Sequence, residues 1–249
     1  HATIRRQRQM CIRDRLRMKF PGFDEFFEIC NGVSPYRWQT RLADQVCSTG
    51  RWPDVLDLPT GTGKTAAIDI ALYSLARSAF AGEFGAVPRR IVLVVDRRVL
   101  VDQAWRRGTR LLESVEQDER LREVRDALSV LSAEPPSSIR LRGACATDPR
   151  WCRSPDQVQI VASTVDQVGS RMLLRGYGVS PSMRPVEAGL VGQDTLLLLD
   201  EAHLSGPLLA TLDSLRSLQP VREMSLRHQV VSLSATPGSS VGSDEFRLR

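Results

Sequence analysis

Long hydrophobic runs are absent from this sequence, whose longest unbroken apolar string is the five residues from Ile91 to Val95. A membrane-spanning helix needs about 20 apolar residues, so the sequence predicts no membrane partner. The N-terminus also has no apolar core of the length that a secretory signal peptide requires. With 42% hydrophobic residues, the chain is too apolar to be disordered. A soluble, folded, cytoplasmic protein is therefore expected.

Cysteine is sparse, because the 249 residues include only five. An odd and low number of cysteines predicts a reduced, cytosolic protein without a disulfide framework. Cys145 and Cys152 have six residues between them and no second cysteine or histidine pair nearby. A zinc site usually needs a tighter pair and two further ligands. We therefore interpret these two thiols as structural.

Lysine is almost missing, with Lys19 and Lys64 as the only two against 32 arginines. The net charge is +5, and residues 1–19, with seven basic residues and Asp14, carry +6 of it against −1 in the rest of the chain. Residues 1–17 are either a basic arm that binds nucleic acid or a foreign leader. We favour a leader that is not native, because the segment resembles a translated sequencing adapter and Met18 is a plausible start. The domain itself then covers residues 18–249 and is close to neutral.

The remaining pattern alternates short apolar runs with helix-like segments, which is typical of an α/β domain with a mostly parallel sheet sandwiched between helices. The loop at residues 176–188 is expected at the surface, and the domain is expected to finish at its sixth strand. The expected strands are 55–58, 91–96, 139–141, 158–162, 195–200 and 230–234. The expected helices are 23–30, 36–48, 65–79, 98–116 continuing through 119–132, 165–174 and 207–218.

A phosphate-binding loop is predicted where the string LPTGTGKT, residues 58–65, joins the first strand to a helix. Glycines let the backbone N–H groups converge on phosphate oxygens at a helix N-terminus. Lys64 would reach the β- and γ-phosphates, and the Thr65 hydroxyl would hold Mg²⁺. The alternative is a glycine-rich turn that binds nothing. The predicted nucleotide-binding residues of the loop are Gly61, Thr62, Gly63, Lys64 and Thr65.

Two adjacent carboxylates, Asp200 and Glu201, end the apolar strand that begins at Thr195. Ligands bind at the carboxyl ends of parallel strands, so this pair is expected beside the phosphate loop. Asp200 suits a magnesium role, and Glu201 suits the positioning and deprotonation of an attacking water. An isolated pair of this kind is more often a solvated strand end. Together with Lys64, it predicts a nucleotide hydrolase whose catalytic residues are Lys64, Asp200 and Glu201.

Asp-Glu-Ala-His at residues 200–203, taken with the phosphate loop, resembles the signature of superfamily 2 helicases. The resemblance implies a RecA-like P-loop domain that uses ATP and Mg²⁺. It implies that Gln39, in Pro-Tyr-Arg-Trp-Gln, reads adenine. It also implies that Ser234 and Thr236, in the segment Ser-Ala-Thr at 234–236, couple hydrolysis to strand movement together with His203. Leu58, which stands where the common loop has Gly or Ala, is a departure from the family pattern.

Single-strand-binding motifs of the same family are matched by residues 95–103 and 163–167. The resemblance places nucleic-acid contacts at Arg98, Arg142, Gly143, Thr164 and Gln167. Asp96-Arg97 replaces the usual Pro-Thr of the first motif, which leaves the role of Arg97 open.

The flanks of these motifs resemble the CRISPR-associated helicase-nuclease of type I interference systems, notably residues 94–103, 163–171 and 199–205. The resemblance implies a prokaryotic DNA helicase or translocase that acts on single-stranded DNA with a CRISPR effector complex. The second RecA-like domain with its arginine finger, and the His-Asp nuclease, are expected to be absent from this chain. The alternatives are an RNA helicase, a restriction translocase, and a nucleotide-dependent binding module without turnover.

Overall fold

The computed structural model describes residues 19–143, 148, 150–201, 205–218, 228–234 and 245–247. One sheet of seven strands runs through it in the order β3-β4-β2-β5-β6-β1-β7, and every neighbouring pair is parallel. The strands are β1 Val55–Asp57, β2 Arg90–Val95, β3 Ser137–Leu141, β4 Gln159–Thr164, β5 Thr195–Asp200, β6 His228–Ser234 and β7 Glu245–Arg247.

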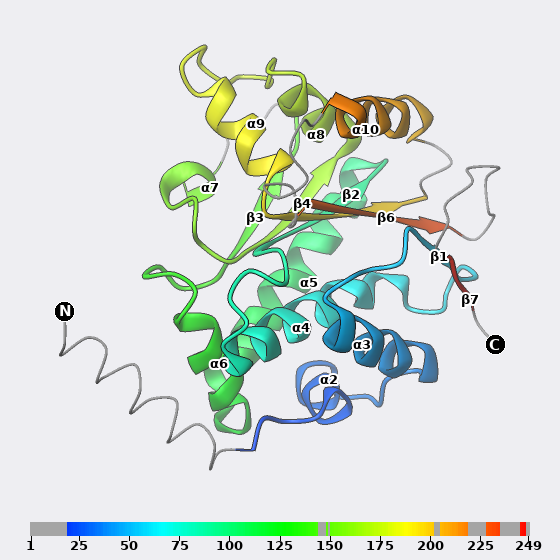
Figure 1. Ribbon diagram of the computed structural model, residues 1–249, viewed down its shortest axis with the longest axis vertical. Helices are drawn as coiled ribbons and strands as arrows, with labels where there is room; N and C mark the ends of the chain where they lie inside the picture. Colours follow the sequence, from blue (N-terminus) through cyan, green and yellow to red (C-terminus); the bar gives the residue numbers. More distant parts are fainter. Residues whose placement is uncertain are drawn as a thin grey trace.

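Helices cover both faces of the sheet, which confirms the predicted α/β architecture (Figure 1). One layer holds α2 Phe23–Asn31, α3 Arg37–Thr49, the 3-10 turn η1 Lys64–Ala66, α4 Ala67–Ala81, α5 Arg98–Gln117, the 3-10 turn η2 Glu119–Leu121 and α6 Arg122–Ser129. The other holds α7 Arg150–Arg153, α8 Val165–Met172, α9 Arg184–Gly192 and α10 Gly206–Leu218.

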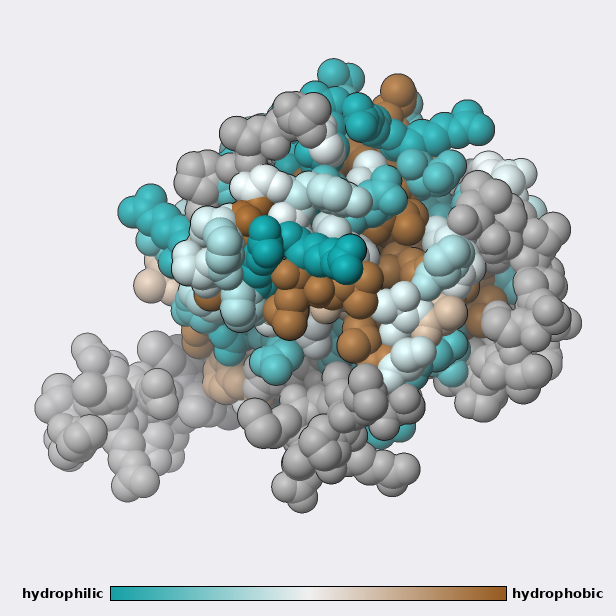
Figure 2. Space-filling view, turned by 90° about the horizontal axis from the view of Figure 1, so that it is seen from above, coloured by the Kyte–Doolittle hydropathy of each residue, from teal (hydrophilic) through white to brown (hydrophobic). Residues whose placement is uncertain are grey.

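Alternate strand residues face the two layers, as a strand period of two requires. On β2, Ile91 and Leu93 belong to the hydrophobic core on the α2–α6 side, while Val92 and Val94 belong to the core on the α7–α10 side. The second layer consists of shorter helices, and hydrophobic surface shows among hydrophilic groups on that face (Figure 2). No helix in the described ranges is long and apolar enough to cross a bilayer.

Helix α4, which follows the phosphate loop, is buried on nearly all sides. A helix that is apolar all round belongs inside a protein, and this one is also pinned by a buried carboxylate. Asp69 accepts hydrogen bonds from Arg107 Nη2 at 2.7 Å and from Asn31 Nδ2 at 2.9 Å. The contacts tie α4 to α5 and α2, so the base of the phosphate loop is held by three helices.

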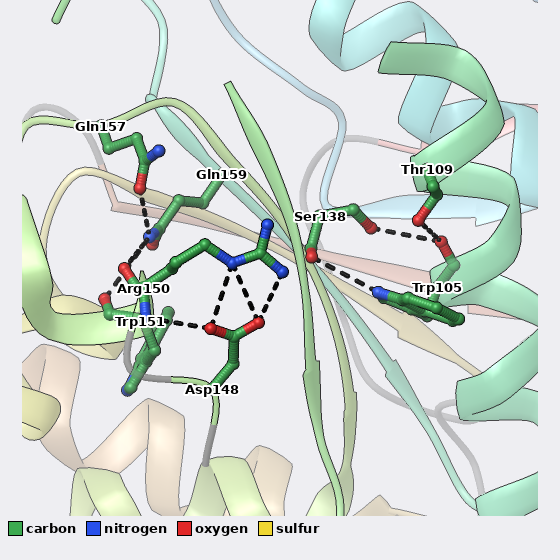
Figure 3. Close-up of polar contacts among 8 residues, drawn as sticks. All are labelled: Trp105, Thr109, Ser138, Asp148, Arg150, Trp151, Gln157 and Gln159. Atoms are coloured by element: carbon green, nitrogen blue, oxygen red, sulfur yellow. Dashed lines mark hydrogen bonds and ion pairs between the residues drawn. The ribbon is translucent and has the colours of Figure 1, made fainter. Parts of the chain in front are cut away.

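Side chains on both faces of β3 and β4 hold the flank of the sheet (Figure 3). On one face, Trp105 Nε1 donates to the Ser138 carbonyl oxygen at 3.3 Å, and the Ser138 hydroxyl donates to the Trp105 carbonyl oxygen at 3.2 Å. On the other face, the fully buried Gln159 donates through Nε2 to the Arg150 carbonyl oxygen at 3.0 Å. These bonds fix α5 and α7 against the strands that end beside the predicted nucleic-acid residues.

All six predicted strands are present, but two expectations about the fold are wrong. The domain does not finish at the sixth strand, since β7 pairs with β1 and buries Phe246 against the core. A three-residue strand with one apolar residue is too short for a pattern to reveal. The predicted loop 176–188 runs into α9 at Arg184, and the four-residue α7 also gave no detectable periodicity.

Candidate functional site

The loop after β1 curls back on itself. Gly61 and Gly63 have left-handed backbones with φ of 79° and 76°, a conformation that glycine adopts without a steric penalty. The Thr62 hydroxyl donates to the Pro59 carbonyl oxygen at 2.7 Å and closes the loop. The Ala66 N–H donates to the Gly63 carbonyl oxygen at 2.9 Å, so η1 begins directly after the loop and leads into α4. The loop therefore ends at a helix N-terminus, where free N–H groups favour an anion.

Lys64 and Glu201 form an ion pair across the site. Lys64 Nζ lies 3.3 Å from Glu201 Oε1, although the two residues are 137 positions apart in the sequence. The Lys64 side chain is 9% exposed and that of Glu201 is 31% exposed, so the cation is the more deeply buried partner. The structure thus brings the predicted phosphate-binding lysine and the predicted base into direct contact.

The Glu201 backbone is left-handed, with φ of 48°, directly after β5. Such a conformation is costly for a residue with a side chain, and conformations of this kind gather at functional sites. The turn redirects the chain at the end of β5 while the Glu201 carboxylate faces Lys64. The sequence contained no sign of this strain, because nothing distinguishes Glu201 from other residues after a strand.

Asp200 is the last residue of β5 and is partly buried. Burial raises the pKa of its carboxyl above the ordinary value of 3.8; the Lys64 charge opposes the rise and the Glu201 charge adds to it. A partly desolvated carboxylate next to a second carboxylate is a favourable place for a cation. Its environment therefore suits the predicted magnesium role.

Two residues at the start of α3, Trp38 and Gln39, hold the phosphate loop. Trp38 Nε1 donates to the Thr62 carbonyl oxygen at 3.1 Å, and Gln39 Nε2 donates to the Gly63 carbonyl oxygen at 3.4 Å. Gln39 Oε1 accepts from the Tyr36 N–H at 2.8 Å, and Gln39 is only 2% exposed. The structure thus gives Gln39 a contact with the loop, and its reading of adenine stays a prediction.

Tyr36 and Trp38 were not predicted as site residues, although they flank Gln39 in the same motif. Tyr36 is 59% exposed, and its ring lies 3.5 Å from the position that a Cβ on Gly63 would occupy. The adjacent aromatic residues in Pro-Tyr-Arg-Trp-Gln were the available signal.

Of the predicted coupling residues, Ser234 is the last residue of β6 and pairs with Asp57 of β1. The residue before it, Leu233, pairs with Asp200 of β5. His203 and Thr236 lie outside the described residues.

Three of the predicted nucleic-acid residues come together from different parts of the chain. A Cβ added to Gly143, after β3, would lie 3.3 Å from Arg98 Nη2 and 3.9 Å from Gln167 Nε2. Arg98 opens α5 after β2, and Gln167 lies in the first turn of α8 after β4. Thr164, the last residue of β4 and the N-cap of α8, is 7% exposed.

Arg142 is the remaining member of the predicted nucleic-acid set. Its Nη1 lies 2.7 Å from Asp102 Oδ2, and Arg140 Nη1 lies 2.9 Å from Asp102 Oδ1. Asp102, one helical turn after Arg98, was not predicted to take part. It partly neutralises two arginines beside the cluster and fixes their orientation.

The two groups of predicted residues occupy neighbouring halves of one sheet edge. The nucleotide residues follow β1 and β5 with β6 between them, and the nucleic-acid residues follow β2, β4 and β3. In a parallel sheet all carboxyl ends lie at the same edge, which is where ligands bind. The strand order therefore places the two groups of predicted residues next to each other at one edge of the sheet.

Comparisons with known proteins add a family and a fold. The family model described as type III restriction enzyme, res subunit, matches residues 32–239. No curated protein matches the sequence. The structure of the DEAD-box helicase Mss116 bound to ssRNA and UDP-BeF is similar, with a TM-score of 0.53 and 15% identity over 90% of this chain and 42% of that chain.

The yeast DEAD-box splicing factor Prp28 is also similar, with a TM-score of 0.50 and 18% identity over 88% of this chain and 45% of that chain. This chain therefore spans less than half the length of either protein. The two likenesses show the fold alone, which is RecA-like.

Proposed function

Because the chain belongs to the type III restriction enzyme res subunit family, we propose that it is the ATP-binding half of a superfamily 2 nucleic-acid motor. One observation carries the proposal. Lys64 of the phosphate loop and Glu201 after β5 are held 3.3 Å apart at the carboxyl edge of the sheet. A glycine-rich loop, a helix N-terminus and a carboxylate pair converge there, which is the arrangement that phosphoryl transfer requires.

The residues at this site fit a magnesium nucleotide. A Cβ added to Gly61 would meet nothing within 4 Å, so the outer side of the loop is open to a ligand. The Thr65 hydroxyl and the Asp200 carboxylate are hard oxygen donors of the kind that Mg²⁺ prefers, and this ion usually keeps several water ligands.

Bound ATP with Mg²⁺ would supply the phosphoanhydride bond whose hydrolysis drives movement. Lys64 would exchange its contact with Glu201 for the β- and γ-phosphate oxygens. The freed Glu201 carboxylate would then orient a water molecule and accept its proton. Trp38 and Gln39 would keep the loop in its binding shape through their bonds to the carbonyl oxygens of Thr62 and Gly63.

Nucleic acid would bind at the adjoining half of the edge, along Arg98, Gly143, Thr164 and Gln167. Contacts from these groups would go mainly to the phosphate backbone, which positions a strand without reading its sequence. Strand β6 lies between β1 and β5, and its end at Ser234 would pass the state of the nucleotide site to the rest of the edge. His203 and Thr236 complete the proposed coupling set.

We extend the proposal to single-stranded DNA in type I CRISPR interference, supported by the sequence flanks of the motifs. The alternative is an RNA helicase, which is supported by the similar structure of the helicase Mss116 bound to ssRNA. Competition between DNA and RNA strands of the same sequence separates the two, since only RNA carries the 2′-hydroxyl group. The DNA proposal is wrong if RNA binds more tightly.

The complete motor is proposed to need a second RecA-like domain that supplies an arginine to the transition state. Such an arginine is worth about 10³ to 10⁵ in rate. We therefore expect this chain alone to bind ATP and to hydrolyse it hardly at all. Strong nucleic-acid-stimulated turnover by the chain alone would refute a catalytic site divided between domains.

Titration of the chain with a fluorescent ATP analogue and Mg²⁺ tests the nucleotide site. Lys64→Ala removes the only lysine near the loop and should abolish measurable binding, because the neutral side chain cannot bind a polyphosphate. Lys19→Ala is the matched control, since Lys19 is exposed and is the only other lysine. Unchanged affinity in Lys64→Ala would overturn the assignment of the loop.

A further inference from the structure

A chain of buried polar side chains leads from the proposed nucleic-acid surface into the second helical layer. Gln167 Oε1 accepts a hydrogen bond from Arg171 Nη1, one turn further along α8. Arg171 Nε lies 2.5 Å from Glu187 Oε2 on α9. Glu187 Oε1 accepts from the Cys152 thiol of α7 at 3.7 Å. The network therefore joins α8, α9 and α7 behind Gln167.

Arg171 and Glu187 are unusually buried for charged residues, with 1% and 5% exposure. A buried charge is costly unless it is paired and hydrogen-bonded, so each constrains the position of the other. Burial raises the pKa of Cys152 to about 12, and the Glu187 charge adds to the rise. Cys152 is therefore a protonated thiol at neutral pH and can donate to Glu187. These contacts make the Arg171 guanidinium a fixed group.

A fixed guanidinium determines which way the Gln167 amide faces. Arginine has five N–H donors and no acceptor, whereas a glutamine side chain has an acceptor oxygen and a donor nitrogen. Only the oxygen can face Arg171. The Nε2 group then faces the other way, toward Gly143, where a Cβ would lie 3.9 Å from it and 3.3 Å from Arg98 Nη2. Within the described part of the chain, Nε2 has no hydrogen-bond partner of its own.

We propose that Arg171, anchored by Glu187, is a positioning residue that locks the Gln167 amide with its N–H donor toward the bound nucleic-acid strand. A donor in this place suits phosphate or ribose oxygens, which are acceptors, and it acts beside the Arg98 guanidinium. The proposal rests on the proposed function, since it assigns the orientation of one contact at that nucleic-acid surface. Arg171 itself contacts no nucleic acid and acts through Gln167 alone.

The first test reverses the polarity of the contact without removing the Arg171 partner. Gln167→Glu keeps an acceptor oxygen for Arg171 but replaces the outward donor by a carboxylate oxygen. We expect binding of a fluorescent single-stranded oligothymidylate to weaken at least tenfold, and by more than in Gln167→Leu. Binding by Gln167→Glu that equals the wild type would overturn the proposal.

The second test is a double-mutant cycle, which measures whether two residues act through one another. Removing one partner of a buried ion pair can unfold a protein, so Arg171→Met is combined with Glu187→Leu, which removes both charges. We expect this variant and Gln167→Leu to weaken oligothymidylate binding by similar factors of about three to ten. The triple variant should bind no more weakly than Gln167→Leu. Losses that multiply would overturn the proposal.

Two further measurements separate positioning from general damage. Affinity for the fluorescent ATP analogue should be unchanged in all of these variants, because the partners of Arg171 in the described ranges are Gln167 and Glu187, which belong to the other half of the edge. A parallel loss of nucleotide affinity would overturn the positioning role. Arg175→Met is the matched control, since Arg175 is exposed and lies four residues after Arg171, past the end of α8. If the wild type binds neither DNA nor RNA strands while its nucleotide binding is intact, the proposed nucleic-acid function is wrong, whatever the variants of Gln167 and Arg171 show.

Discussion

The ion pair between Lys64 and Glu201 gives the sharpest prediction, because one substitution separates binding from chemistry. Glu201→Gln keeps the size of the side chain and removes its charge. At 3.3 Å and an effective dielectric constant near 20, the gross attraction is roughly 5 kcal/mol. Desolvation of Lys64 offsets most of it, and the partial exposure of Glu201 weakens it further. We expect about 1 kcal/mol of net stabilisation from the pair.

Lys64 must leave Glu201 to bind a polyphosphate, so removing the pair should favour nucleotide binding. About 1 kcal/mol corresponds to a roughly fivefold change in an equilibrium constant. Glu201→Gln is therefore expected to bind the fluorescent ATP analogue about fivefold more tightly, and to unfold in urea with about 1 kcal/mol less stability. In the complete motor the same substitution should block turnover, because the amide cannot accept the proton of water.

The control for this prediction is Glu83→Gln, which removes a carboxylate from an exposed position after α4. It should change neither nucleotide affinity nor stability. The reasoning is refuted if Glu201→Gln loses nucleotide affinity as Lys64→Ala does. That result would mean that Glu201 assists nucleotide binding and does not compete for Lys64.

Two further predictions concern charge burial and packing. Because burial raises the Asp200 pKa, the ionised form of Asp200 opposes folding. Asp200→Asn should therefore unfold at a higher urea concentration than the wild type at pH 7, and this gain should disappear as the pH falls below the ordinary carboxyl pKa. The same substitution should weaken Mg²⁺-dependent nucleotide binding. Equal gains at neutral and acidic pH would contradict this. Gly108→Ala should cost about 1 to 2 kcal/mol, because its Cβ would lie 2.8 Å from Ile160 Cγ2 and 2.9 Å from the Ser138 hydroxyl. Gly189→Ala in α9 meets nothing within 4 Å and should leave stability equal or raised in the same urea titration.

Local patterns in the sequence were sufficient to predict much of this protein. Six strands could be recognised because each is a short run of Val, Ile and Leu between turn residues, as in β2 and β5. The phosphate loop could be recognised because glycines, a lysine and a hydroxyl side chain must stand at set spacings to bind phosphate. The nucleic-acid residues came from resemblance to a family and not from residue patterns.

Long-range contacts could not be predicted in the same way. The strand order, which places β6 between β1 and β5 and adds β7 beyond β1, depends on how helices pack on both faces. The contact of Lys64 with Glu201 and that of Trp38 with the loop join residues far apart in the sequence. No local pattern encodes such a pairing.

The sequence by itself therefore determined the chemical groups of this protein, namely the glycine loop with Lys64, the carboxylates after β5 and the strands that carry them. Only the tertiary structure decided which groups face each other: Lys64 with Glu201, Gln39 with the loop, and Arg171 with Glu187. The physical reason is that local spacing fixes secondary structure and side-chain type. Partners across the sheet are chosen by the packing of buried apolar surface over the whole chain, and a buried charge such as Arg171 is stable only where that packing supplies its partner.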